Sequence, residues 1–142
     1  MDQMSKGKYS KLFLIGALWN LSIGGSALLL PGLINKLVFG FKTVITYGPT
    51  TFAFRIMWAL IFVYGIGYYF VSQDPEKNRG IVWMGILGKM AVFITALFYF
   101  PRKVISLLAM LLCFGDFVFS ILFALFLAKT KDEAKGAVPK AA

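Results

Sequence analysis

Residues 104–128 read VISLLAMLLCFGDFVFSILFALFLA, an apolar run with a single charge at Asp116. A helix rises 1.5 Å per residue, so about 20 residues cross the hydrocarbon core of a bilayer, which is about 30 Å thick. The run is too long for a buried strand. Because lipid satisfies no backbone polar group, the run must form a helix. It predicts one transmembrane span.

Three earlier runs have the same character, at residues 12–30, 52–71 and 81–100. The first has no charge, the second contains Arg55 and the third contains Lys89. The sequence therefore predicts an all-α, integral membrane four-helix bundle with antiparallel neighbours, formed as a single domain by residues 1–128. Residues 129–142 are small, charged and contain a proline, which predicts a disordered cytoplasmic tail.

The composition supports a membrane protein and argues against several other classes. Apolar residues make up 59% of the chain and charged residues 15%, and the mean hydropathy is +0.78. A soluble domain is about 45–50% apolar and about 25% charged. The net charge of +9 would favour nucleic acid in a soluble protein, but the basic residues flank the apolar runs, so we expect no nucleic-acid partner.

The chemistry-bearing residue types are few. The chain has no histidine and one cysteine, Cys113, which rules out an intrachain disulfide and leaves no usual haem ligand or zinc-site arrangement. Paired carboxylates, a nucleophile triad and metal-ligand spacing are also absent from the sequence. We therefore expect no catalytic residues, metal or cofactor, and no enzyme activity.

The first apolar run has an alternative interpretation as a signal peptide. Lysines precede it, and Gly25-Ser26-Ala27 is a possible small-residue cleavage site. The run nevertheless continues through Leu28-Leu29-Leu30, which makes it long enough to anchor the chain. We expect it to be retained as the first span.

Lysine and arginine flanking the spans favour cytoplasmic N- and C-termini, by the excess of positive charge on the cytoplasmic side. With that orientation, the cytoplasmic side holds Lys6, Lys8, Lys11, Lys77, Arg79, Lys129, Lys131, Lys135 and Lys140. The other side holds Lys36, Lys42, Arg55, Arg102 and Lys103. The sequence thus predicts a multi-pass protein of the cytoplasmic (inner) membrane.

The three connections differ in length and character. Pro101-Arg102-Lys103 is so short that the third and fourth spans must be antiparallel neighbours. The first connection, residues 31–51, alternates apolar and polar residues at roughly helical spacing. This predicts a short helix in the membrane interface, with a plain loop as the alternative. The apolar residues are Leu33, Ile34, Leu37, Val38 and Phe41, and the polar ones are Asn35, Lys36 and Lys42.

Polar residues recur near the middle of the membrane in three spans. At 1.5 Å per residue from the cytoplasmic side, Asn20 lies at about 13 Å, Lys89 at about 12–14 Å and Asp116 at about 18 Å. Tyr64 of the second span lies at about 11–12 Å. A charge here costs at least ~2.5–3.5 kcal/mol, so these side chains are expected to face the bundle interior and pair.

We predict a Lys89–Asp116 ion pair, with Asn20 donating to Asp116 or spanning the two charges, and with Tyr64 close by. Arg55 lies nearer the outer interface, where its side chain is expected to reach the head groups. Small residues share the helix faces of the polar ones, as close helix packing requires. These faces are Gly16, Asn20 and Gly24; Gly85, Lys89, Val92 and Ala96; and Ala109, Cys113, Asp116 and Ser120.

Aromatic residues gather toward the ends of the spans, which is typical of the belts at membrane interfaces. They are Trp58, Tyr68, Tyr69, Trp83, Tyr99 and Phe100.

Several short motifs resemble those of small bacterial four-span membrane proteins to which no activity is assigned, and more distantly the DoxX-like group. They are Trp19-Asn20, Arg55, Gly67-Tyr68, Asp74-Pro75, Arg79, Gly88-Lys89 and Gly115-Asp116. The resemblance covers the four spans and not the tail. It implies a four-span bundle and, through the DoxX-like group, a link to quinone-coupled oxidation.

Three function classes remain open from the sequence. The leading one is an accessory, assembly or interaction subunit whose partners are the lipid bilayer and other membrane protein subunits. The second is a small solute or proton-linked transporter that uses the Asn20, Lys89 and Asp116 cluster. The third is a quinone-linked redox component. A purely structural role, in which the polar cluster only fixes helix order, is the alternative to a functional site. The sequence leaves the oligomeric state open.

Overall fold

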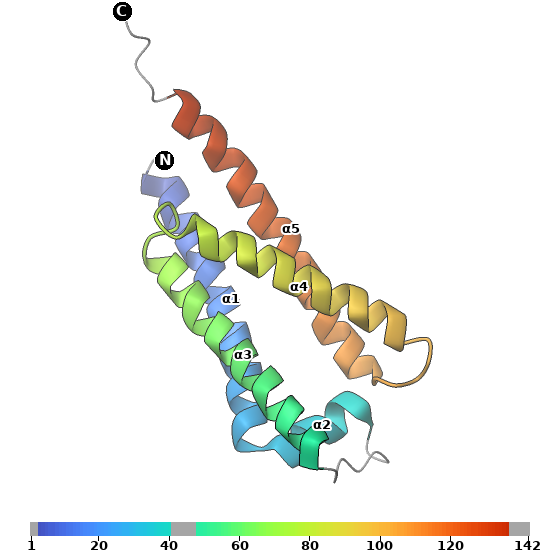
Figure 1. Ribbon diagram of the computed structural model, residues 1–142. Helices are drawn as coiled ribbons and strands as arrows, with labels where there is room; N and C mark the ends of the chain where they lie inside the picture. The colour runs from blue at the N-terminus through green and yellow to red at the C-terminus, as the bar shows by residue number, and fades with distance from the viewer. Residues whose placement is uncertain (1–2, 41–47, 137–142) are drawn as a thin grey trace, which may run out of the picture.

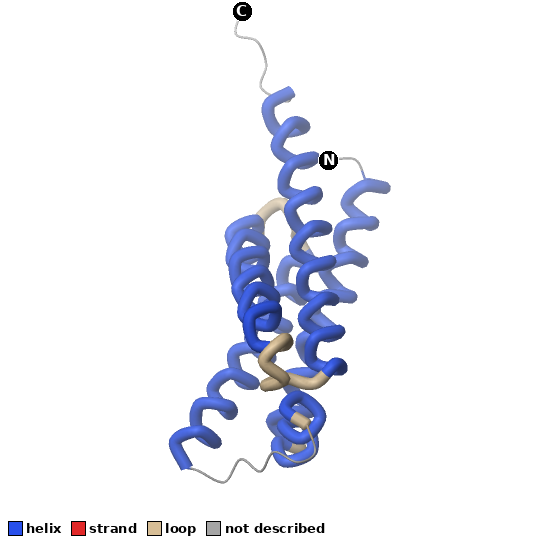
Figure 2. The backbone as a smooth tube through the Cα atoms, turned by 90° about the vertical axis from the view of Figure 1, so that its right-hand side faces the viewer, coloured by secondary structure: helices blue, strands red, loops and turns tan. Residues whose placement is uncertain are grey.

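The computed structural model describes residues 3–40 and 48–136, and their side chains from residue 6 to residue 130. This part of the chain contains five helices and no strand (Figures 1 and 2). They are α1 (Gln3–Leu29), α2 (Pro31–Phe39), α3 (Gly48–Gln73), α4 (Arg79–Tyr99) and α5 (Leu107–Gly136). The all-α prediction is confirmed.

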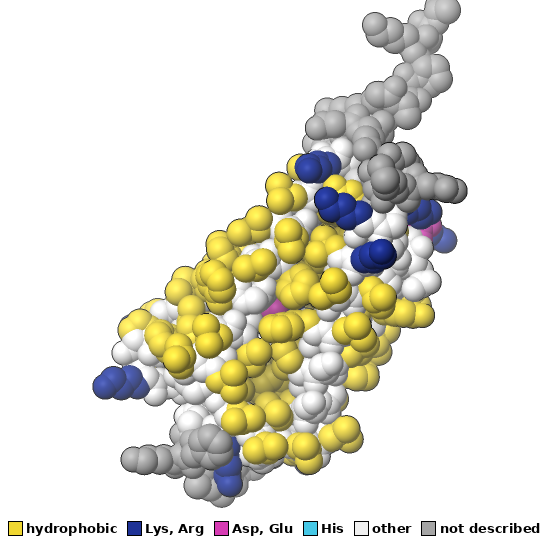
Figure 3. Space-filling view, turned by 180° about the vertical axis from the view of Figure 1, so that it is seen from behind, with side chains coloured by type: hydrophobic (Ala, Val, Ile, Leu, Met, Phe, Trp, Pro, Cys, Tyr) yellow, Lys and Arg dark blue, Asp and Glu magenta, His cyan; other side chains and the backbone are white. Residues whose placement is uncertain are grey.

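Four of these helices are long and apolar enough to cross a membrane, which confirms the predicted four-span bundle. The candidate spans are Lys6–Leu29, Gly48–Gln73, Arg79–Tyr99 and Leu107–Thr130. Their outward faces carry exposed leucine, isoleucine, valine and phenylalanine side chains, and Figure 3 shows one such apolar face. Exposing these apolar side chains to water would be unfavourable, whereas contact with the lipid tails of a bilayer carries no such cost.

The bundle consists of two helix pairs, α1 with α3 and α4 with α5 (Figure 1). The N-terminal end of α1, the α3–α4 connection and the C-terminal end of α5 lie at one end of the bundle, which we call the terminal end. The α2 helix and the α4–α5 connection lie at the opposite end. Successive spans therefore run in alternating directions.

Glycines bring α1 and α3 into close contact. A Cβ atom added at Gly24 would lie 2.7 Å from the backbone nitrogen of Phe62. One added at Gly65 would lie 2.8 Å from the backbone nitrogen of Leu21. Backbone atoms cannot move aside as a flexible side chain can, so only glycine permits this spacing. Small residues that let backbones approach are a common way to pack helices in lipid, where no hydrophobic force joins them.

Aromatic rings fill the space between the two pairs at the terminal end. Phe13 of α1 packs between Phe123 and Phe126 of α5, with ring centroids 4.7 and 5.1 Å apart. Tyr68 of α3 contacts Phe123 edge-on at 5.1 Å. Tyr68 is only 1% exposed and Trp58 only 5%, so both pack in the bundle interior. Both fall on the inward face of α3, which position along a span does not reveal.

Arg79 fastens α4 to α5 at the same end. Its guanidinium donates to the backbone oxygen of Leu127 at 3.0 Å and to the hydroxyl of Thr130. It also lies 5.7 Å from the centroid of the Phe126 ring.

The predicted helix in the first connection is present as α2, so the alternative of a plain loop was wrong. Pro31 stands at its first position, where the missing N–H has no cost. Asn35 of α2 accepts a hydrogen bond of 3.1 Å from the indole of Trp58. Phe41 and Lys42 lie outside the described residues.

Ser106 joins α2 to the start of α5. Its backbone N–H donates to the oxygen of Val38 at 2.7 Å, and its hydroxyl donates to the oxygen of Leu37. The same hydroxyl accepts from the N–H of Ala109, which is the arrangement of a helix N-cap. The cap starts α5 at Leu107, later than the predicted span start at residue 104.

The end of α5 also differs from the prediction. The helix continues to Gly136 and so includes residues 129–136. Three lysines, one alanine and one glutamate, all good helix formers, lie in this segment and extend the long helix that precedes it. Residues 137–142 lie outside the described residues.

The packing of α1 on α3 predicts different effects at two adjacent glycines. We expect Gly24→Ala to destabilise the bundle by about 1–3 kcal/mol, because the new methyl group meets the α3 backbone. In Gly25→Ala the methyl group would make only ordinary contact, 3.6 Å from the Phe62 ring, and should be neutral or slightly stabilising. Melting temperatures of both variants in one detergent test this. Equal melting temperatures would show that the helices are not in such close contact.

Candidate functional site

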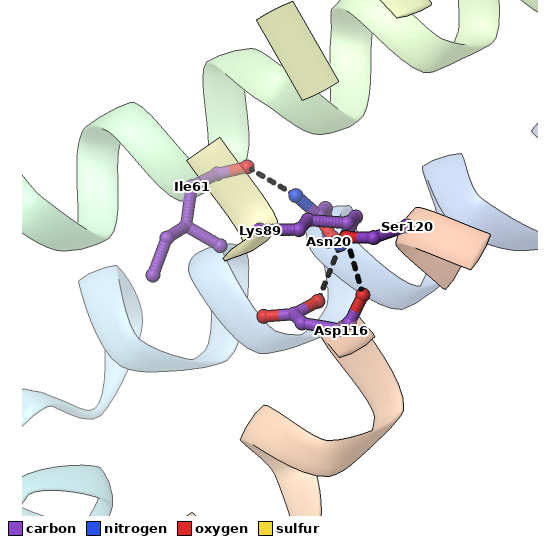
Figure 4. A network of polar contacts seen from close by, with 5 residues as sticks. All are labelled: Asn20, Ile61, Lys89, Asp116 and Ser120. Carbon is purple, nitrogen blue, oxygen red and sulfur yellow. Dashed lines mark hydrogen bonds and ion pairs between the residues drawn. The ribbon is translucent and has the colours of Figure 1, made fainter. Parts of the chain in front are cut away.

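The polar centre of the bundle is an ion pair between α4 and α5. The Lys89 ammonium contacts a carboxylate oxygen of Asp116 directly (Figure 4). The Lys89 side chain is 5% exposed and that of Asp116 is 20% exposed. Ser120, one turn from Asp116, donates to the Asp116 backbone oxygen at 3.0 Å. The two charges thus neutralise each other in the interior of the bundle.

Asn20 links this pair to α1 and α3. Its side-chain oxygen accepts a hydrogen bond of 3.1 Å from the Lys89 ammonium. Its side-chain nitrogen donates to the backbone oxygen of Ile61 at 3.4 Å (Figure 4). The predicted donation from Asn20 to Asp116 is therefore wrong. An ammonium group needs acceptors, so the amide turns its oxygen to Lys89.

Two aromatic rings complete the surroundings of the cation. The Lys89 nitrogen lies 5.4 Å from the ring centroid of Tyr68 and 5.3 Å from that of Phe119. Both distances are within the range of cation–π attraction, which strengthens where water is excluded. Sequence reasoning missed both residues. The available signal was spacing, since Tyr68 lies one turn from Tyr64, and Phe119 three positions from Asp116.

Tyr64 and Arg55 lie outside this network. The Tyr64 ring packs over Gly88, where an added Cβ atom would lie 3.3 Å from the hydroxyl oxygen. Its ring centroid is 6.1 Å from that of Tyr68, so Tyr64 packs beside Tyr68 rather than against the ion pair. Arg55 is exposed on α3, 13 residues before Tyr68, which is the α3 residue beside Lys89. The structure therefore brings together Asn20, Lys89 and Asp116 and leaves Tyr64 and Arg55 apart.

The predicted small-residue faces mostly point inward. Gly16, Asn20 and Gly24 are all buried, as are Gly85 and Ala96. A Cβ atom at Gly85 would lie 2.7 Å from the Tyr68 hydroxyl, so glycine makes room for that ring beside Lys89. Val92 is the exception, with 42% exposure although it shares the face of Lys89.

The chemical capacity of the cluster follows from its parts. A carboxylate accepts hydrogen bonds, and an ammonium donates them. Among the described residues, no group of three His, Cys, Asp or Glu side chains is placed to hold a metal ion. The arrangement is suited to holding helices in register, and its accessible carboxylate edge to accepting a hydrogen bond or a proton.

Comparison of the chain with protein-family models, with curated proteins and with solved structures finds no match. The fold and the site therefore define the class directly. The chain is a small polytopic membrane protein, with four membrane-spanning helices around a buried ion pair.

The buried pair predicts a non-additive response to mutation. We expect Lys89→Met alone to cost about 3–5 kcal/mol, because it leaves the Asp116 carboxylate without a counter-ion. The double variant Lys89→Met/Asp116→Leu should recover much of that loss, since no charge is left unpaired. Unfolding in mixed micelles measures the stabilities of the wild type, of Lys89→Met, of Asp116→Leu and of the double variant. Losses that simply add would contradict direct pairing.

Asn20 and Tyr64 provide a second comparison within the site. We expect Asn20→Leu to lose about 1.5–3 kcal/mol, the value of a hydrogen bond to a charged group. Tyr64→Phe should change stability little, because the Tyr64 hydroxyl does not contact the pair. The same unfolding measurement decides, and a larger loss for Tyr64→Phe would place Tyr64 in the network instead of Asn20.

Proposed function

We propose that this protein is an interaction or assembly subunit of the cytoplasmic membrane. The observation that carries the proposal is the enclosure of Lys89. Its ammonium is shared among Asp116 of α5, Asn20 of α1 and the Tyr68 ring of α3, so one cation connects all four spans. Because the polar interior holds the helices together, we infer that the protein contacts its partners through its apolar outer surface.

The distribution of basic residues supports cytoplasmic termini. The terminal end of the bundle carries Lys6, Lys8, Lys11, Lys77, Arg79 and Lys129. The opposite end carries Lys36, Arg55, Arg102 and Lys103. Because lysine and arginine are enriched on the cytoplasmic side of membrane proteins, the terminal end is the cytoplasmic one in this proposal.

A proton-linked transporter is the second candidate, and a different observation favours it. Asp116 is 20% exposed, so its carboxylate is not fully enclosed by the bundle. A transporter needs a titratable group that one side of the membrane can reach. Lys89 and Asn20 would then hold the carboxylate in place while protons exchange at its accessible edge.

One purification followed by two measurements separates the candidates. The tagged chain is extracted in a mild detergent, its bound proteins and lipids are identified by mass spectrometry, and it is then placed in liposomes for proton-flux assays. An interaction subunit should bring another membrane protein in a fixed ratio and show no flux above that of empty vesicles. Recovery of the chain alone, with a proton flux that Asp116→Asn abolishes, would instead establish a transporter. A bound quinone would support the redox role.

A further inference from the structure

The contacts between α1 and α5 gather on the terminal side of Gly115. Trp19 of α1 covers Gly115, where an added Cβ atom would lie 2.9 Å from the indole. Toward the terminal end, Gly16 and Phe13 of α1 meet Phe123. Beyond Trp19, toward the opposite end, no ring contact or hydrogen bond joins α1 to α5 among the described residues, and α5 is next held by α2 at Ser106. We call the surface of α1 and α5 between these two regions the α1–α5 face.

The exposure of α5 side chains shows that α1 does not cover α5 along this face. Leu108 lies on the same side of α5 as Phe119 and Phe126, because the spacings of 11 and 7 residues correspond to whole turns. Phe126 is fully buried against α1, whereas Leu108 is 45% exposed. Figure 3 shows acidic atoms set back among the hydrophobic side chains of the bundle surface. Asp116 follows Gly115, which Trp19 of α1 covers, and its side chain is 20% exposed, so we place it at the inner edge of the α1–α5 face.

The exposed carboxylate edge at mid-membrane needs a hydrogen-bond donor. A charged group at this depth is costly unless it is paired, and Lys89 engages one of the carboxylate oxygens. Lipid tails carry no donor, and the donors of phospholipid head groups lie about 15 Å away, at the surface of a core about 30 Å thick. A neighbouring transmembrane helix brings donors to that depth.

The chain itself presents such donors. Ser22 and Ser26 are exposed on α1, on the outward stripe that also carries Ile15 and Leu18. They are one turn apart, a spacing of small residues that lets two membrane helices approach closely. Ser26 is seven residues from Trp19 and therefore lies on the side of α1 that faces α5. Serine hydroxyls and the open carboxylate thus adjoin the same face.

We propose that two copies of this chain dimerise through the α1–α5 face, with Ser22 of each copy donating to Asp116 of the other. Two copies with the same orientation are related by a two-fold axis along the membrane normal, so groups that meet must lie at equal depth. Ser22 is two residues, about 3 Å, from the level of Asn20, which is linked to Asp116 through Lys89. This requirement is therefore met. The proposal rests on the interaction function and names the partner.

Disulfide trapping between single-cysteine copies tests the geometry. In a Cys113→Ala background, Ser26→Cys is placed in one tagged copy and Leu112→Cys, one turn from Asp116, in a second copy with another tag. Each copy has one cysteine, so a disulfide between the tags is intermolecular. We expect oxidation in membranes to join these copies. The matched control replaces Leu112→Cys with Leu87→Cys, on the 64% exposed outer side of α4, and should not be joined.

The role of the carboxylate is tested without the internal ion pair. Lys89→Met/Asp116→Asn and Lys89→Met/Asp116→Leu both remove the pair, but only the asparagine retains a hydrogen-bonding group for the partner. We expect the dimerisation constant of the first variant in liposomes to be about tenfold larger than that of the second. Two hydrogen bonds between transmembrane helices of the two copies would give a difference of this size. Single-molecule photobleaching measures the dimer fraction. Equal dimerisation of the two variants would overturn the proposal, as would a wild-type monomer.

The outcomes separate this inference from the proposed function. A monomer that still co-purifies with another membrane protein would refute the dimer and leave the interaction role intact. A dimer joined at the α1–α5 face that brings no other protein and conducts protons would support the dimer and refute the interaction role. Joining of the Leu87→Cys control in place of Leu112→Cys would move the interface to α4 and overturn the proposal.

Discussion

The arrangement of this protein depends on the desolvation of Lys89. An ammonium group far from water in a bilayer is tolerated only with close acceptors, and here these come from α1 and α5, with aromatic rings of α3 and α5 around it. The requirement fixes which helices adjoin α4 and at what level. It also accounts for Gly85, which makes room for the ring of Tyr68. Apolar packing alone would not specify which helices adjoin α4 or at what level, because the apolar sides of all four spans resemble one another.

Helix association elsewhere in the bundle relies on two different means. The α1–α3 pair approaches through Gly24 and Gly65, so backbone touches backbone. The contact between α1 and α5 is made by large rings, with Phe13 set between Phe123 and Phe126. Rings keep two helices farther apart than glycines do. The bundle is therefore tight within the α1–α3 pair and wider between the pairs, and the polar centre lies where the wider spacing begins.

Much of the fold was predictable because membrane thickness limits both the length and the structure of each span. The polar centre was partly predictable, since residue depth along oppositely directed spans brought Asn20, Lys89 and Asp116 to one level. Depth does not specify rotation about the helix axis, which is why Tyr64 was chosen and Tyr68 was missed. The start of α5 depends on Ser106 contacting α2, a tertiary contact with no local pattern. The functional class could not be reached this way, because an apolar exterior is common to many membrane proteins.

The separation of Lys89 and Asp116 along the chain has a consequence for synthesis. Asp116 follows Lys89 by 27 positions. At about 5–20 residues per second, the lysine is made about 1–5 s before its counter-ion. If α4 entered the bilayer during that interval, it would carry an unpaired charge into a region where charge is unfavourable. We therefore expect α4 and α5 to enter the bilayer together as a helical hairpin, after α1 and α3 have paired. The order of membrane insertion is thus encoded in the position of one carboxylate.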